Sequence, residues 1–111
     1  LRLETPPLPV IKGRENRGAQ VYKTMWGDNE FFMDGNLKDY DRTDRLSSFK
    51  IPTLYSCGRF DEASPDTVKI YSDLTPTSEF HVYENSAHMP HWEDPDEYLA
   101  TVREFLIRCE A

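Results

Sequence analysis

The sequence predicts an α/β fold, with two strand–helix units in succession over residues 51–109. Two short segments, Ile51–Cys57 and Glu79–Glu84, have the length and composition of strands. Each is followed by a segment with helical periodicity and a helix-start signal, at residues 64–74 and 94–109. This order is typical of a parallel sheet whose crossover helices cover its faces.

The two strands are predicted from different patterns. Pro52 stands near the start of the first strand and Gly58 directly after it. That placement suits a buried parallel strand, in which proline is tolerated only at the beginning. The second strand alternates Phe80 and Val82 with ring side chains that carry polar atoms. One of these, His81, is expected to have a structural role.

Both helices are predicted to begin at a proline. Ser64–Pro65 supplies an N-cap and a first-turn proline for a helix that ends near Leu74. Asp94–Glu97 predicts a capping box for the second helix. The apolar face of the first helix is expected to comprise Val68, Tyr71 and Leu74. That of the second is expected to comprise Tyr98, Leu99, Val102, Phe105 and Leu106.

The first half of the chain carries weaker signals. Residues 1–20 are proline-rich and then charged, which predicts an irregular segment. Residues 21–49 are rich in aromatic side chains and interrupted by glycines, with a short helix expected at 41–49. Three parts are therefore expected: residues 1–20, 21–49 and 50–111.

Composition excludes several classes of function. The net charge of −7 argues against nucleic acid as a partner, because phosphate binding needs clustered Lys and Arg. No apolar run is long enough to cross a bilayer, so no membrane partner is expected. Cys57 and Cys109 do not form a disulfide framework and are expected to be reduced core thiols, which favours a cytoplasmic location.

Asp61 and His88 are the candidate catalytic residues, because each follows a predicted strand in a polar loop. A nucleophilic serine needs a histidine base, which a carboxylate orients and stabilises. In α/β-hydrolases these groups occur in the order Ser, Asp or Glu, His along the chain. The sequence has the last two in that order but no G-x-S-x-G nucleophile motif. We therefore expect an incomplete fold, the C-terminal βαβα part of an α/β-hydrolase parallel sheet.

Other candidate residues are weaker. His91 competes with His88 for the role of base, but it lies nearer to a helix start and is expected to line a pocket wall. No His, Cys, Asp or Glu cluster has metal-ligand spacing, and no glycine-rich phosphate loop is present. No metal and no cofactor are expected.

Several motifs then resemble one family. They are the segments Met25–Phe31, Gly35–Asp41, Ile51–Leu54, Gly58–Glu62 and His88–Asp94. Together they are similar to proline iminopeptidases, α/β-hydrolases that release N-terminal proline or other residues from short peptides, with amino-acid amidases as close relatives.

The resemblance implies roles for four residues. Asp61 resembles the triad acid and His88 the triad base. Glu62 and Glu30 resemble the carboxylates that hold the α-amino group of the substrate, since a buried ammonium needs compensating charge. Residues 21–49 would be the end of the cap (lid) region and the return to the core. The implied partners are a short peptide or amino-acid amide substrate and an N-terminal portion that carries the nucleophilic serine.

Three interpretations stay open from the sequence. The first is the C-terminal portion of a serine aminopeptidase, inactive alone because it carries no nucleophile. The second is a related amidase or ester hydrolase, which replacement of Glu30 and Glu62 would discriminate. The third is a non-catalytic truncated or split fragment, which would expose a strand edge and tend to aggregate or pair.

Overall fold

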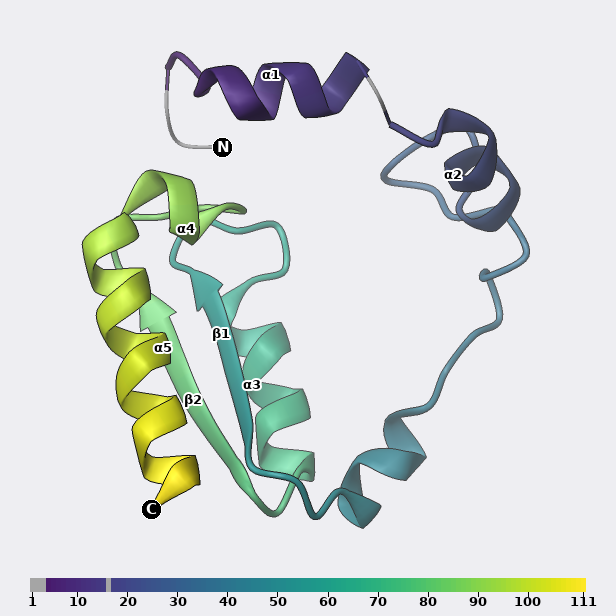
Figure 1. The fold of residues 1–111 in the computed structure, drawn as a ribbon. Coiled ribbons are helices and arrows are strands. Elements are labelled where there is room, and N and C mark those ends of the chain that lie inside the picture. The colour runs from purple at the N-terminus through teal and green to yellow at the C-terminus, as the bar shows by residue number, and fades with distance from the viewer. Residues whose placement is uncertain (1–3, 16) are drawn as a thin grey trace. The chain divides into compact units, whose positions relative to one another are not determined.

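A computed structural model describes residues 4–15 and 17–111. The chain separates into two compact units, one comprising residues 43–111 with the N-terminal residues and the other Pro6–Arg42. Figure 1 shows the strands and the longest helix in the first of these units. Each unit is described by itself.

A two-stranded parallel sheet forms the centre of the larger unit. β1 (Thr53–Gly58) pairs with β2 (Ser78–Tyr83) along their whole lengths, from Thr53 opposite Ser78 to Gly58 opposite Tyr83. Both predicted strands are confirmed. Because the strands are parallel and in register, their carboxyl ends lie at the same edge of the sheet (Figure 1).

Two helices cover opposite faces of this sheet. α3 (Pro65–Leu74) packs on one face, where the Lys69 ammonium lies 5.9 Å from the centre of the Phe80 ring. α5 (Pro95–Glu110) covers the other face, where Glu97 bonds to His81. Neighbouring residues of β2 thus point to opposite helices, as strand geometry requires. The α/β prediction is confirmed, and the sheet of two strands is a partial one.

Two further elements, η1 (Thr43–Ser48) and α4 (Pro90–Glu93), belong to the larger unit. The first, a 3₁₀ helix, occupies the segment where a short helix was expected. α3 begins as predicted, because the hydroxyl of its N-cap Ser64 accepts a bond from the Thr67 amide. A short helix, α4 (Pro90–Glu93), precedes α5. Among residues 4–15 and 17–111, no helix combines the length and apolar character needed to cross a bilayer.

The predicted capping box of α5 is wrong. Asp94 is the N-cap residue, but its side chain makes no capping bond. The Glu97 carboxylate instead lies 3.0 Å from Nε2 of His81, across the gap between helix and sheet. The Glu97 carboxylate therefore makes a tertiary contact with β2 instead of a local capping bond.

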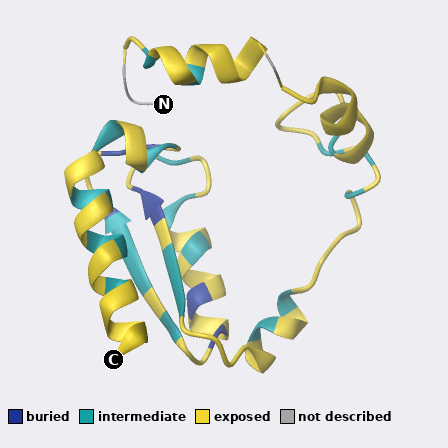
Figure 2. Cartoon of the chain, in the orientation of Figure 1, coloured by how far each residue is buried: buried dark blue, intermediate teal, exposed yellow. Residues whose placement is uncertain are grey.

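The apolar core is smaller than the helical patterns predict. Among the described residues, the buried apolar ones are Cys57, Tyr83 and Ala87, and Figure 2 shows how few positions are buried. Four residues expected in the core are instead exposed: Tyr71, Leu74, Leu99 and Leu106. A sheet of two strands is too narrow to cover the full width of either helix face. Cys109, predicted as a core thiol, is also exposed, whereas Cys57 is buried; neither is disulfide-bonded.

The smaller unit has helices, but no side chain is buried among its residues 6–15 and 17–42. α1 (Leu8–Glu15) forms where an irregular segment was expected, and α2 (Ala19–Met25) follows it. Neither helix has a buried residue, and exposed positions predominate in both (Figure 2). Hydrophobic periodicity reveals helices that bury one face. A helix that buries none gives no such signal, which is why the sequence pattern did not predict α1.

Candidate active site

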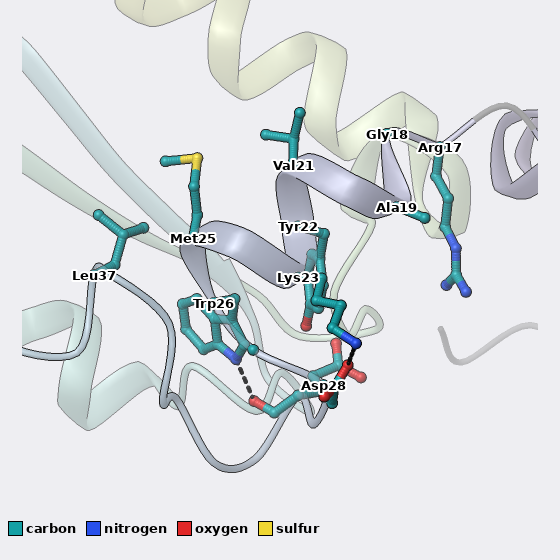
Figure 3. Close-up of a pocket in the computed structure, with 12 residues that line it drawn as sticks. Arg17, Gly18, Ala19, Val21, Tyr22, Lys23, Met25, Trp26, Asp28 and Leu37 are labelled. Carbon is teal, nitrogen blue, oxygen red and sulfur yellow. Dashed lines mark hydrogen bonds and ion pairs between the residues drawn. The ribbon is translucent and has the colours of Figure 1, made fainter.

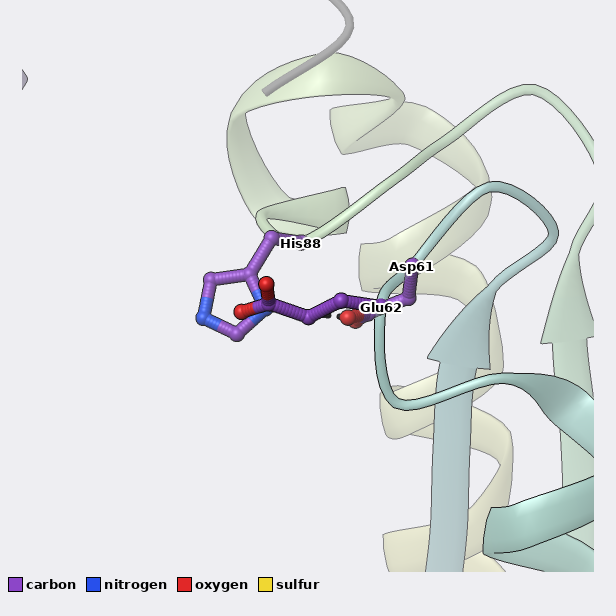
Figure 4. A group of neighbouring side chains, drawn as sticks. All are labelled: Asp61, Glu62 and His88. Atoms are coloured by element: carbon purple, nitrogen blue, oxygen red, sulfur yellow. Dashed lines mark hydrogen bonds and ion pairs between the residues drawn. The ribbon is translucent and has the colours of Figure 1, made fainter. Parts of the chain in front are cut away.

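The structure brings Asp61 and His88 together. Asp61 lies three residues beyond β1 and His88 five residues beyond β2, in loops at the same edge of the sheet. Nδ1 of His88 is 3.1 Å from Oδ1 of Asp61 (Figure 4). Open α/β sheets place their sites at the carboxyl ends of strands, and this pair lies there.

Backbone hydrogen bonds hold the two loops against each other. The Arg59 amide donates to the Tyr83 carbonyl at 2.9 Å, and the Phe60 amide donates to the Ser86 carbonyl at 3.0 Å. A Cβ atom at Gly58 would collide with the Ala87 and Ser86 carbonyl oxygens. The position therefore requires glycine, and the close approach of the loops depends on it.

An ion pair adds a second connection between these loops. The Arg59 guanidinium makes two bonds to the Glu84 carboxylate, one of them 2.8 Å from Nε to Oε2. The hydrogen bond to Glu84 raises the pKa of Arg59, and the same bond lowers the pKa of Glu84. Both side chains are exposed, so the pair orients the loops more than it stabilises them.

The environment of the pair is asymmetric. The Asp61 side chain is only 9 % exposed, whereas that of His88 is 62 % exposed. Oδ1 of Asp61 also accepts a bond from the Ala63 amide at 3.0 Å, which fixes the carboxylate. The hydrogen bond to Asp61 raises the pKa of His88, and the nearby Glu62 charge adds to this effect. With Nδ1 bonded to a carboxylate, Nε2 is the atom that can accept a proton.

Glu62 lies beside the pair. Its Oε1 atom is 4.0 Å from Nδ1 of His88, and its side chain is half exposed. The three side chains place ligand atoms within 4.8 Å of one another, a spacing that a divalent cation could bridge. Nδ1 is already bonded to Asp61, however, and that arrangement suits proton transfer.

Glu30 belongs to the other unit, where a tight turn presents it. The indole Nε1 of Trp26 donates to the Glu30 carbonyl at 3.0 Å, and Asn29 accepts from the Phe31 amide at 2.9 Å. Gly27 has a φ of 127°, which other residues rarely adopt. Trp26 and Glu30 contribute to the wall of an open hollow between α2 and this turn (Figure 3).

The two other histidines make contacts of their own. The ring centre of His91 is 5.8 Å from that of Tyr98. His81 bonds to Glu97, which agrees with a structural role. In the other unit, Phe31 at the end of the motif Met25–Phe31 is 85 % exposed.

Two residues that shape this site were not singled out from the sequence. Gly58 was predicted as the end of a strand and as part of a family motif, although a glycine directly before a polar loop is also a signal for close backbone approach. Glu93 lies in the family motif His88–Asp94, but the sequence assigned it no role of its own. Its carboxylate accepts bonds from the amides of Ala87 and Met89, on either side of His88.

Comparison with known proteins gives a consistent result. No family model matches the chain. It is 56% identical over 90 residues to a proline iminopeptidase of Heyndrickxia coagulans, covering 81% of this chain and 31% of that protein. A proline iminopeptidase of Saccharolobus solfataricus is 36% identical over 107 residues, covering 96% of this chain and 34% of that protein. The chain thus spans about a third of the length of these relatives.

Solved structures agree with the sequence relatives. The proline iminopeptidase of Mycobacterium smegmatis superposes with a TM-score of 0.89 at 35% identity, over 96% of this chain and 36% of that one. An esterase of Thermogutta terrifontis has a TM-score of 0.65 at 21% identity, over 99% of this chain and 47% of that one, which bears on the fold alone. The predicted resemblance is confirmed: this chain is related to the proline iminopeptidases and has part of an α/β-hydrolase fold.

Proposed function

We propose that this chain is the C-terminal portion of a serine aminopeptidase that releases N-terminal proline, or another small or apolar residue, from peptides. Asp61 and His88 are its triad acid and base, and Glu62 and Glu30 bind the substrate amine. The nucleophilic serine comes from the preceding portion of such an enzyme. By itself the chain is therefore inactive.

The observation that carries this proposal is the bond between His88 and the largely buried Asp61 at the carboxyl edge of the sheet. In the proposed reaction, Nε2 of His88 takes the proton from the serine hydroxyl as its oxygen attacks the substrate carbonyl. His88 then gives this proton to the departing amine, which leaves an acyl-enzyme. A water molecule, deprotonated by the same nitrogen, hydrolyses the acyl-enzyme and regenerates the serine. Asp61 stabilises the imidazolium in both steps.

Specificity for a free N-terminus is assigned to carboxylates. Glu62 stands next to the triad acid, with a carboxylate oxygen 4.0 Å from the His88 ring. An ammonium held there would lie close to the scissile bond of an N-terminal residue. Glu30 is included because its sequence motif matches the family, and the turn around it is fixed by hydrogen bonds from Trp26 and to Asn29.

The test is a graft. The chain replaces the matching segment of the Heyndrickxia coagulans relative, which supplies the rest of the enzyme, and hydrolysis of proline p-nitroanilide is measured. We expect activity from the graft and none from the chain alone. In the graft, His88→Ala should lower kcat at least about 10³-fold. If the isolated chain hydrolyses the substrate and keeps doing so with His88→Ala, the triad assignment is wrong.

Amine recognition is tested in the same graft. Glu62→Gln and Glu30→Gln should each lower kcat/KM for the prolyl anilide by about 10- to 100-fold, because a hydrogen bond to a charged group is lost. A neutral p-nitrophenyl ester without an amine should be hydrolysed at an unchanged rate. Equal losses on both substrates would contradict a role in binding the amine and would favour an ester hydrolase.

A further inference from the structure

We propose that Glu93 is a positioning residue for the histidine base, and that it acts by holding the backbone on both sides of His88. Its role in catalysis rests on the proposed function, whereas its role in placing the imidazole does not. Glu93 accepts hydrogen bonds from the backbone on either side of His88, so it would act through the loop.

The contacts form a clamp. One carboxylate oxygen, Oε2 of Glu93, accepts from the Ala87 amide at 3.0 Å and from the Met89 amide at 2.9 Å. In addition, the Glu93 amide donates to the Met89 carbonyl at 3.0 Å, so these two residues are bonded in both directions. The residues before and after His88 are therefore fixed to the same atom, which leaves little freedom for the Cα atom between them.

The loop needs such a clamp because its other attachment downstream of His88 is local, a bond from the Trp92 amide to the Met89 carbonyl at 2.9 Å. Upstream of His88, the Ser86 carbonyl accepts from Phe60, and Ala87 is buried against Gly58. Downstream, the chain enters α4, a helix of only four residues. The His88 side chain itself is largely exposed and receives little packing. Its direction toward Asp61 thus depends on the backbone, and Glu93 is the half-buried group that joins the two sides.

Acceptor geometry and charge can be separated at this position. Because both bonds go to one oxygen, the amide oxygen of glutamine can accept both. Glu93→Gln therefore keeps the clamp and removes the charge, whereas Glu93→Ala removes both. Asp61 and Glu62 are the carboxylates that act on the His88 ring, and they are unchanged in either variant.

The experiment is an NMR titration of the histidine rings in the 111-residue chain, with exchange of the Ala87 and Met89 amides followed in parallel. In the parent chain the His88 pKa lies above its ordinary value because of the Asp61 bond. Glu93→Ala should lower the pKa of His88 toward the value that His88 has in the Asp61→Asn variant. The same change should speed exchange of the Ala87 and Met89 amides about tenfold or more. Glu93→Gln should leave both quantities near those of the parent chain.

A matched control is available on α5. Glu97 also bonds to a histidine ring, at 3.0 Å from His81. Glu97→Ala should therefore shift the NMR resonances of the His81 ring and leave the titration of His88 unchanged. This control separates an effect on the His88 loop from a general loss of structure, which would alter both rings.

The outcomes distinguish the possible roles. Parent-like His88 titration in Glu93→Ala would overturn the proposal. A lowered His88 pKa in Glu93→Gln with protected Ala87 and Met89 amides would also overturn it, in favour of a charge effect. In the active graft, Glu93→Ala should lower kcat and leave KM unchanged, with rescue by Glu93→Gln. If the graft is inactive, the proposed function fails while the titration still decides the position of His88.

Discussion

The two units of this chain differ in what holds their candidate site residues. In the unit of residues 43–111, Asp61 and His88 are placed by paired strands, by backbone bonds between loops and by a glycine that permits close contact. In the unit Pro6–Arg42, Glu30 is placed by one tight turn, and neither helix of the unit buries a residue. The first site is built by tertiary contacts and the second by local ones.

The difference teaches where each unit obtains its stability. Burial of apolar surface is the main favourable term in folding, and short isolated helices are marginal in water. The larger unit has a small core around Tyr83, whereas in the described part of the smaller unit only Gly27 is buried. We therefore expect the two units to respond differently to the same kind of perturbation.

The largest expected effect is that of Gly58→Val. The added side chain would collide with the Ser86 and Ala87 carbonyl groups and force the two loops apart. The larger unit should lose about 3 kcal/mol of unfolding free energy. Trp92 is the only tryptophan left in a Trp26→Phe background, so its fluorescence in urea reports on this unit alone. An unchanged urea midpoint would show that the loops are not packed as described.

Amide exchange should separate the two units in the parent chain. Backbone amides of β1 and β2 should exchange about 100-fold more slowly than those of α1 and α2, because local opening costs little where no side chain is buried. Residue-resolved exchange measured by NMR gives both sets in one experiment. Equal protection in the two units would mean that the helices of Pro6–Arg42 are held by contacts of their own.

The Asp61–His88 bond should give the larger unit a pH-dependent stability. The pKa of His88 is raised in the folded state, mainly by the bond to Asp61. The stabilisation is therefore fully present below the unfolded pKa and is lost as the pH rises through the folded pKa. Asp61→Asn should destabilise the unit more at about pH 5.5 than at about pH 9. Urea unfolding at both pH values, followed by Trp92 fluorescence, measures this difference. If Asp61→Asn lowers the unfolding free energy equally at both pH values, the pairing is contradicted.

The smallest expected effect is that of Gly13→Ala, the counterpart of Gly58→Val in the smaller unit. Apart from its chain neighbours and the backbone of α1 itself, nothing lies within 4 Å of the position that a Cβ would take at Gly13. Alanine should therefore stabilise α1 by about 0.5–1 kcal/mol through its higher helix propensity. Slower amide exchange within α1, with an unchanged Trp92 transition, is the expected result. Destabilisation would show that the helix end is not as open as described.

Sequence patterns predicted the elements that depend on local signals. Ser64 caps α3 as expected, and both strands occur where they were predicted, the first from an apolar run bounded by proline and glycine and the second from alternation. The same reasoning failed for Glu97, whose carboxylate joined the sheet contact of His81 instead of a capping box. The prediction that Leu99 is buried was also wrong, because helical periodicity does not reveal the width of the sheet on which the helix packs.

The order of Asp61 and His88 along the chain, and their place after two strands, were determined by the sequence alone, because strand and turn signals are local. Their 3.1 Å bond was decided by tertiary structure. It needs parallel pairing in one register, a close approach at Gly58 and, in our proposal, the clamp of Glu93 on the His88 loop. None of these has a local sequence signature. The strand pairing and the Gly58 contact depend on atoms that are distant in sequence, and the Glu93 bonds depend on which acceptor the Ala87 and Met89 amides bond to in the folded chain.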